Sequence, residues 1–309
     1  MSNHTPATTL GIDIGGSAIK LAKLVGGGLA ATHRGESYQS PTIDQLRQQL
    51  ITTNAGLSSA TSAQAANQPT DQATDQVAAI GVSVPGPVDP NGTVIQAGNL
   101  QAIEGLDVGQ WVAQTLGLDV PVLVSTDALA GAVGAALIDP MPGRVLYLAL
   151  GTGVGGALLD DGQPVTFTRG TPGHIGHIDV SGGNPDAPST PAAGRGALEA
   201  YLGAPALRAA GLNLDDVAAC ANHPAMARVN QALARAIRIL LALYRMDHVV
   251  LIGGLSGIFE PGLAQVRGLV NDALTTAAPS KWTLSTSDIG PFAAAVGAAK
   301  LAQGQLDSV

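Results

Sequence analysis

Two glycine turns, each set between short apolar segments, constrain the fold of this chain more than any other feature. The first turn, Gly15-Gly16-Ser17, interrupts an apolar stretch at 10–24. The second, Gly151-Thr152-Gly153, interrupts a similar stretch at 144–160. Two short strands around a glycine turn are typical of a β-hairpin. Because the pattern occurs twice, we expect two similar halves with a cleft between them.

Strand and helix patterns alternate along the rest of the chain. Further strands are expected at 77–84, 120–124 and 248–252, and helices at 43–50, 108–116, 127–138, 230–244 and 292–302. The segment 52–76 is rich in Ala, Ser, Thr, Gln and Asn, and it is either a weak surface helix or a loop. Strands that alternate with helices predict an α/β fold.

Composition excludes several classes of protein. The 309 residues suffice for two domains, and 46% hydrophobic against 12% charged residues allows each domain a core. The net charge of −8, with no basic cluster, argues against a nucleic-acid partner. No apolar run reaches the ~20 residues that cross a membrane. The polar start at 1–9 lacks the apolar centre of a signal peptide, so we expect a cytoplasmic protein.

The only cysteine, Cys220, is expected to be buried as a packing residue. A single cysteine forms no internal disulfide and supplies no thiolate zinc cluster.

The glycine turns favour phosphate binding. Glycine lets the backbone approach a phosphate closely and direct amides at its oxygens, and Ser17 and Thr152 add hydroxyl groups. A third turn, Gly253-Gly254, also follows an expected strand. Ordinary tight turns are the alternative. None of the three is the Gly-Lys-Ser/Thr phosphate loop or a dinucleotide fingerprint.

Two acidic residues stand where catalytic chemistry needs them. Asp13 ends a strand beside the first glycine turn, where a carboxylate suits either Mg²⁺ binding or capping of the turn. Lys20 either screens phosphate charge or is a solvated strand residue. Asp127 follows Ser125 and Thr126 at the start of an expected helix. It is therefore either a helix cap or the carboxylate that accepts a hydroxyl proton in phosphoryl transfer.

A pair of histidines, His174 and His177, lies in a glycine-containing segment that favours a loop over a helix. Two histidines three residues apart can bind a metal, but no cysteine or carboxylate set accompanies them. Imidazoles that bind substrate hydroxyls are the favoured interpretation, and purely structural histidines are the alternative.

These motifs resemble those of the ROK sugar kinases, a family within the actin and hexokinase superfamily. The resemblance runs from about Leu10 to Leu301, in the family's order, through LGIDIGGSAIKLAKL, GVSVPGPVDPNG, STDALAGAVGAAL, LALGTGVGGALLDDG and VVLIGGLSG. It implies two actin-like, ribonuclease H-like domains with an active-site cleft between them. We expect a small N-terminal domain of 1–126 plus 292–309 and a large C-terminal domain of 127–291.

Residue by residue, the resemblance implies Asp127 as the general base and Asp13 as the Mg²⁺ and phosphate residue. It assigns the nucleotide to the three glycine turns, with Lys20 beside them. It implies that the following residues contact the sugar: Gly86, Asn99, Thr126, His174, His177 and Glu199. The expected cofactors are ATP and Mg²⁺, and the expected assembly is a homodimer.

The chain departs from the family pattern at three places. Thr126 replaces the usual Asn, and His174 replaces the usual Glu. The region 181–198 contains no cysteine where the family has a zinc motif, so we expect no structural zinc. Altered hydroxyl contacts make plain glucose a doubtful substrate.

The resemblance therefore implies ATP-dependent phosphorylation of a hexose, an amino sugar or a related polyol. A non-catalytic sensor of the same fold and a kinase that uses polyphosphate are the alternatives. Regulators in the family carry an N-terminal DNA-binding helix-turn-helix. Because the first hairpin is predicted to start at Leu10, we do not expect a regulator of that kind.

Overall fold

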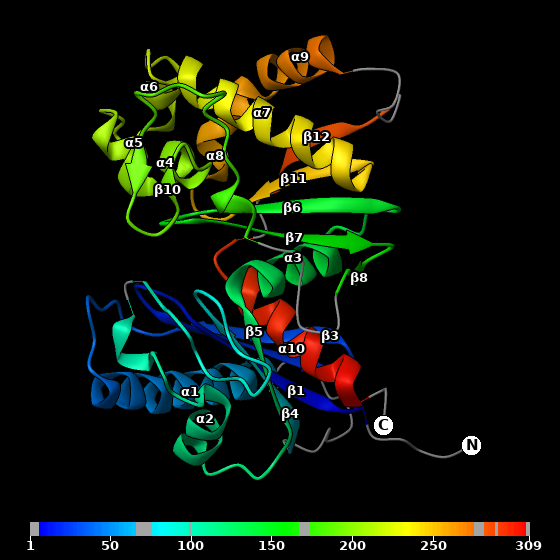
Figure 1. The fold of residues 1–309 in the computed structure, drawn as a ribbon. Helices are drawn as coiled ribbons and strands as arrows, with labels where there is room; N and C mark the ends of the chain where they lie inside the picture. Colours follow the sequence, from blue (N-terminus) through cyan, green and yellow to red (C-terminus); the bar gives the residue numbers. More distant parts are fainter. Residues whose placement is uncertain are drawn as a thin grey trace. The chain divides into compact units, whose positions relative to one another are not determined.

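The computed structural model describes residues 6–65, 76–98, 100–166, 174–274, 281–287 and 290–306. Contacts between Cα atoms divide the chain into two compact units, Met1–Leu137 with Phe292–Val309 and Ile138–Pro291 (Figure 1). Each unit holds a five-stranded sheet.

The sheet of the first unit has the order β3-β2-β1-β4-β5. Its strands are β1 (Thr8–Ile14), β2 (Ile19–Val25), β3 (Gly28–Arg34), β4 (Val77–Val84) and β5 (Val122–Thr126). The first three strands are antiparallel neighbours, and β4 and β5 run parallel to β1. Strand β5 begins two residues later than expected, after Pro121, because proline has no N–H for a strand ladder.

Different helices pack on the two faces of this sheet. Apolar side chains of β1 and β4 pack with helices α1 (Ile43–Ala65) and α2 (Val108–Leu116) in one core. The alternate residues of β1 and β4 include Gly11 and Gly81, where a Cβ would overlap backbone atoms of α10 (Ala293–Leu306). Since side chains alternate along a strand, Asp13 shares the face of Gly11. Small residues therefore let the last helix lie on the sheet face that carries Asp13.

Helix α3 (Asp127–Ile138) packs against α10 through the same kind of close contact. A Cβ at Gly134 would overlap the backbone of Ala293, and one at Gly297 would overlap that of Ala130. These contacts place α3 with the first unit. The boundary therefore lies at 137/138, whereas the expected boundary at 126/127 assigned this helix to the other domain.

The sheet of the second unit repeats the topology of the first, with the order β12-β11-β6-β7-β8. Its strands are β6 (Arg144–Leu150), β7 (Val154–Asp160), β8 (Gln163–Pro164), β11 (His248–Ile252) and β12 (Thr283–Thr286). Antiparallel pairing joins β6 to β7 and β7 to β8, and β11 and β12 run parallel to β6. The expectation of two similar α/β halves is confirmed.

Helix α7 (Met226–Tyr244) supplies more residues to the core of the second unit than any other helix. It starts four residues earlier than expected and ends at Arg245, which has a left-handed backbone with φ 51°. Helix α9 (Leu263–Ala273) packs beside α7 in the same core. The remaining short helices and strands are α4 (Glu199–Leu202), α5 (Ala204–Ala209), α6 (Val217–Ala221), α8 (Ser256–Phe259), β9 (Ser189–Thr190) and β10 (Gly194–Arg195).

Cys220 is buried in α6, as expected, and its Sγ donates to the carbonyl oxygen of Asn213 at 3.0 Å. Across the described ranges, no helix combines the length and the apolar character needed to span a bilayer.

Candidate functional site

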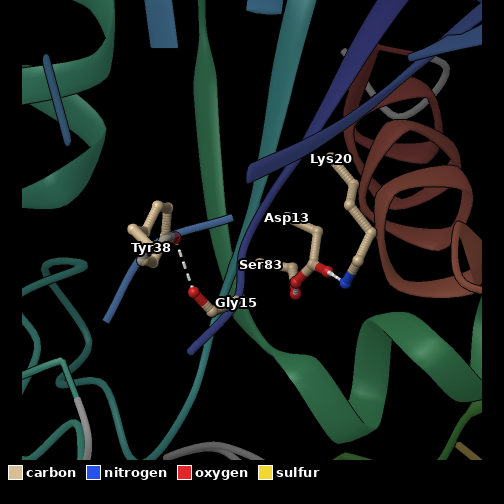
Figure 2. Close-up of polar contacts among 5 residues, drawn as sticks. All are labelled: Asp13, Gly15, Lys20, Tyr38 and Ser83. Atoms are coloured by element: carbon tan, nitrogen blue, oxygen red, sulfur yellow. Dashed lines mark hydrogen bonds and ion pairs between the residues drawn. The ribbon is translucent and has the colours of Figure 1, made fainter. Parts of the chain in front are cut away.

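Asp13 is a buried carboxylate with a partner for each oxygen. Its Oδ2 accepts from Lys20 Nζ at 2.8 Å, and its Oδ1 accepts from Ser83 Oγ at 3.1 Å (Figure 2). Asp13 is directly opposite Lys20 in the antiparallel β1–β2 pair and opposite Ser83 in the parallel β1–β4 pair. Strand register therefore builds this cluster. Lys20 is held in an ion pair with 19% of its side chain exposed, so the solvated-residue alternative is wrong.

The first glycine turn is held closed from two sides. Within the turn, Gly15 N donates to Ala18 O at 3.2 Å. From outside it, the Tyr38 hydroxyl donates to Gly15 O at 2.6 Å, and Tyr38 N donates to Ser17 O at 2.9 Å. Burial, with the negative charge of Asp13 adding to it, raises the pKa of Tyr38 above its usual range, so its hydroxyl remains a donor. Gly16 and Ser17 stay exposed at the tip of the turn.

Asp127 is the first residue of α3, and the residue before it caps the helix. Thr126 Oγ1 accepts from Leu129 N at 3.3 Å, which is the N-cap hydrogen bond. Asp127 Oδ1 accepts from Ala128 N at 2.7 Å. The backbone amide of Asp127 itself is a second donor to its carboxylate. The helix does not need Asp127 as its cap, because Thr126 supplies that hydrogen bond.

The surroundings of Asp127 favour a proton acceptor that works near neutral pH. Desolvation by the surrounding protein is the largest effect, and together with the negative charge of Asp13 it raises the pKa of Asp127 to about 6, against lowering by the Ala128 hydrogen bond and by Lys20. Asp127 as a whole residue is exposed, so protein atoms crowd its carboxyl without sealing it from water.

In the second unit, two glycine turns meet at one edge of the sheet. Strands β6 and β11 are parallel, so their carboxyl ends lie together, and these ends carry Gly151-Thr152-Gly153 and Gly253-Gly254. Leu255 N donates to Leu150 O at 3.2 Å, which fastens the second turn to the end of β6. Gly253 has φ +94°, and a Cβ there would meet Leu150 O at 2.5 Å. Glycine is therefore required at 253 by the fold itself.

Gly151 and Gly254 are not required by the protein's own packing. A Cβ at either position would meet nothing within 4 Å, and neither residue has a positive φ. The space beside both backbones is open, so a ligand can approach them closely, although the Gly151 N–H already donates to Gly153 O at 3.0 Å. This is the property that a phosphate-binding turn needs.

The expected sugar-side residues of the second unit gather near the start of β7. Glu199 Oε2 accepts from Val154 N at 3.0 Å, and a Cβ at Gly153 would lie 2.7 Å from the same oxygen. His174 and His177 stack with ring centroids 5.2 Å apart, on a 3₁₀ turn at Ile175–His177. Both histidines are exposed. Glu199 is thus attached directly to the second glycine turn.

Two further residues expected to contact the sugar follow β4 in the sequence. Gly86 has φ +85°, and a Cβ there would overlap the carbonyl of Gln96, so only glycine fits the fold. Asn99 lies outside the described residues.

The cysteine-free region 181–198 is held by hydrogen bonds. Strands β9 and β10 pair, Ala193 N donates to Thr190 Oγ1 at 3.1 Å, and Arg195 Nη1 donates to Pro185 O at 2.6 Å. In the part of the chain that the structure describes, no three His, Cys, Asp or Glu side chains cluster as a metal site would require.

Sequence reasoning missed Tyr38 and Ser83. Ser83 alternates with buried apolar residues in β4, and a polar residue at such a position is a usable signal. Tyr38 belongs to no motif, and its contact with Gly15 spans 23 residues. Only the folded chain reveals it.

The model of the ROK family matches residues 9–305 of this chain. The chain belongs to the ROK family. N-acetylmannosamine kinase of Salmonella typhimurium is 30% identical, over 96% of this chain and 99% of the relative. Curated relatives of this ROK protein are therefore named as sugar kinases.

Solved structures show the same fold. A ROK family glucokinase from Streptomyces griseus, in complex with glucose and AMPPNP, aligns with a TM-score of 0.72 and 23% identity, over 96% of this chain and 100% of that one. A ROK family transcriptional regulator, a homologue of the E. coli MLC protein, aligns with a TM-score of 0.78 and 19% identity, over 99% of this chain and 80% of that one. At these identities the likeness concerns the fold, and it confirms two actin-like domains for this ROK protein.

Proposed function

We propose that this protein is a sugar kinase that transfers the γ-phosphoryl group of ATP to a hydroxyl of a hexose, an amino sugar or a related polyol. The observation that carries the proposal is the state of Asp127. This carboxylate belongs to an exposed residue, has a pKa raised to about 6, and is not needed as a helix cap because its neighbour Thr126 supplies one.

Asp127 would act as the general base. In the reaction, the sugar hydroxyl oxygen forms a bond to Pγ, the bond from Pγ to the bridging oxygen breaks, and ADP leaves. The hydroxyl proton passes to the Asp127 carboxylate. A base with a pKa near 6 is ionised at neutral pH and still accepts a proton readily, which is the compromise that general-base catalysis favours.

The residues present fit ATP and Mg²⁺. The open space beside Gly151 and Gly254 lets phosphate oxygens approach the backbone of both turns. Bound Mg²⁺ would neutralise charge on the transferring phosphoryl group. Asp13 has a partner on each oxygen, but a carboxylate offers about four lone-pair positions, so it keeps the capacity to accept from a metal-bound water.

An N-acylated hexosamine is the first substrate to test. The relatives with 30% identity are named N-acetylmannosamine kinases. A site that pairs hydroxyl groups discriminates strongly by which of them it binds. His174 in place of an acidic residue alters one such contact, so we place plain glucose second. We also propose a cytoplasmic homodimer, as the family resemblance implies.

The test is a coupled assay of ADP release with ATP, Mg²⁺ and a panel of N-acetylmannosamine, other amino sugars, hexoses and cyclitols. We expect turnover with at least one member, and loss of turnover in Asp127→Asn. Polyphosphate in place of ATP tests the alternative donor. If nucleotide and sugar both bind but no donor yields a phosphorylated product, the protein is a sensor and the kinase proposal is wrong.

A further inference from the structure

The second unit contains a polar pocket that no step of the proposed reaction uses. Its volume is about 330 Å³, and it lies between the turn at 181–184 and one face of α7. Arg228, Gln231 and Arg235 line it from α7, and Tyr201 lines it from α4. None of the expected nucleotide or sugar residues lines it. A volume near 300 Å³ is at the lower end of the range for small-molecule sites.

Arg235 is fixed in this pocket by the backbone. Its Nη1 donates to Val180 O at 2.9 Å and to Ser181 O at 3.1 Å. Gly182, with φ +64°, lies against the guanidinium, and a Cβ there would be 3.3 Å from Nη1. Guanidinium carries five N–H donors, so Nη2 and Nε keep theirs after these contacts. The group is oriented without being neutralised.

Arg228 is oriented in a similar way. It precedes Arg235 by seven residues, or about two turns, on the same face of α7. Its guanidinium carbon lies 5.2 Å from the centre of the Tyr201 ring, and its Nη2 donates to Asp186 O at 3.4 Å. Within the described residues, no carboxylate oxygen comes within 4.0 Å of either arginine's nitrogens. The lining contains no acidic residue. In a chain of net charge −8, this is a local concentration of uncompensated positive charge.

We propose that this pocket binds a phosphate group. Two pre-oriented guanidinium forks match the oxygens of a dianionic phosphate, and each fork can bind two oxygens at once. Ser181, Asn184 and Gln231 add neutral donors around the same volume. The volume exceeds what free phosphate needs, which favours a small phosphomonoester over the free ion. The proposal goes beyond the sugar kinase activity and does not depend on it.

The experiment is isothermal titration calorimetry of the full-length protein at low ionic strength, with inorganic phosphate in one arm and glucose 6-phosphate in the other. Arg228→Ala should weaken binding at least tenfold, as expected from loss of a charged hydrogen-bonding group. The matched control is Arg238→Ala, which removes an exposed arginine from the same helix outside the pocket. It should bind as tightly as the unaltered protein.

Each outcome is decisive. Tighter binding of glucose 6-phosphate than of inorganic phosphate, lost in Arg228→Ala, assigns the pocket to a phosphomonoester. Equal binding of both, lost in the same variant, assigns it to the phosphate group alone. No binding of either probe, or equal affinity in Arg228→Ala and in the unaltered protein, overturns the proposal. Because nucleotide contacts lie elsewhere, this failure would leave the kinase proposal standing.

Discussion

Replacing Asp127 with Asn removes a negative charge and a proton acceptor while leaving the start of α3 in place. The Asn side-chain oxygen can still accept from Ala128 N, and Thr126 still supplies the cap. Loss of a general base costs about 10² to 10⁴ in rate. We therefore expect kcat to fall by about that factor, with the affinity for a non-hydrolysable ATP analogue changed by less than about threefold.

The raised pKa also predicts the direction of the stability change. The folded-state pKa of about 6 lies above the ordinary aspartate value of 3.8, so the folded protein binds this proton more tightly than the unfolded chain. Above pH 6 the carboxylate is ionised in both states, and its charge disfavours the folded one. Asp127→Asn should therefore be at least as stable as the unaltered protein at pH 7.5, and its advantage should shrink as the pH falls from 6 towards 4.

The assay combines steady-state kinetics, nucleotide titration and urea unfolding. The matched control is Asp107→Asn, which changes the N-cap of α2 in the same unit, where Oδ1 accepts from Gln110 N at 2.9 Å. Asn caps helices as well as Asp does, so activity and stability should both persist. Near-normal kcat in Asp127→Asn would refute the role of this residue as base. A large loss of stability would refute the interpretation of its pKa.

Four further substitutions test other parts of the structure. Because the charge of Lys20 lowers the pKa of Asp127, Lys20→Met should move the acidic limb of the kcat/KM profile to higher pH, and an unmoved limb would contradict this coupling. Tyr38→Phe removes the hydrogen bond to the first glycine turn and should raise KM for ATP several-fold while leaving KM for sugar unchanged; equal changes in both would argue against a phosphate-specific role. Gly81→Ala should lower the free energy of unfolding by about 1–3 kcal/mol, since its Cβ would overlap the backbone of α10. Gly268→Ala, exposed in α9 with nothing within 4 Å, should instead raise it by about 0.5–1 kcal/mol in the same urea titration.

Local features of the fold could be predicted well. The hairpins around both glycine turns, strand β4 and helix α2 lie where the sequence patterns place them. These elements depend on apolar alternation and on glycine at turns, which neighbouring residues encode. The assignment of an element to one of the two units was harder to predict, because it depends on contacts with residues far away in the sequence. Helix α3 could not be assigned to a unit from its sequence, because that assignment follows from its contact with α10.

The residues of the candidate site also differ in how well the sequence predicts them. Asp127, Asp13 and the three glycine turns could be named from motifs, since each stands at the end of a predicted strand. Their partners could not be named. The Ser83 contact with Asp13 spans 70 residues, and the Glu199 contact with Val154 spans 45.

By itself, the sequence determined two hairpin-led α/β halves, an acidic residue at the start of a helix, and glycine in the turns that follow three strands. The tertiary structure alone decided that Asp13 is paired with Lys20 and Ser83, that Thr126 frees Asp127 from capping, and that two arginines of α7 face a common pocket. The physical reason is the sequence separation of the contacting residues. Periodicity records which way a side chain points along its own strand or helix, whereas strand register and helix packing decide what it meets there.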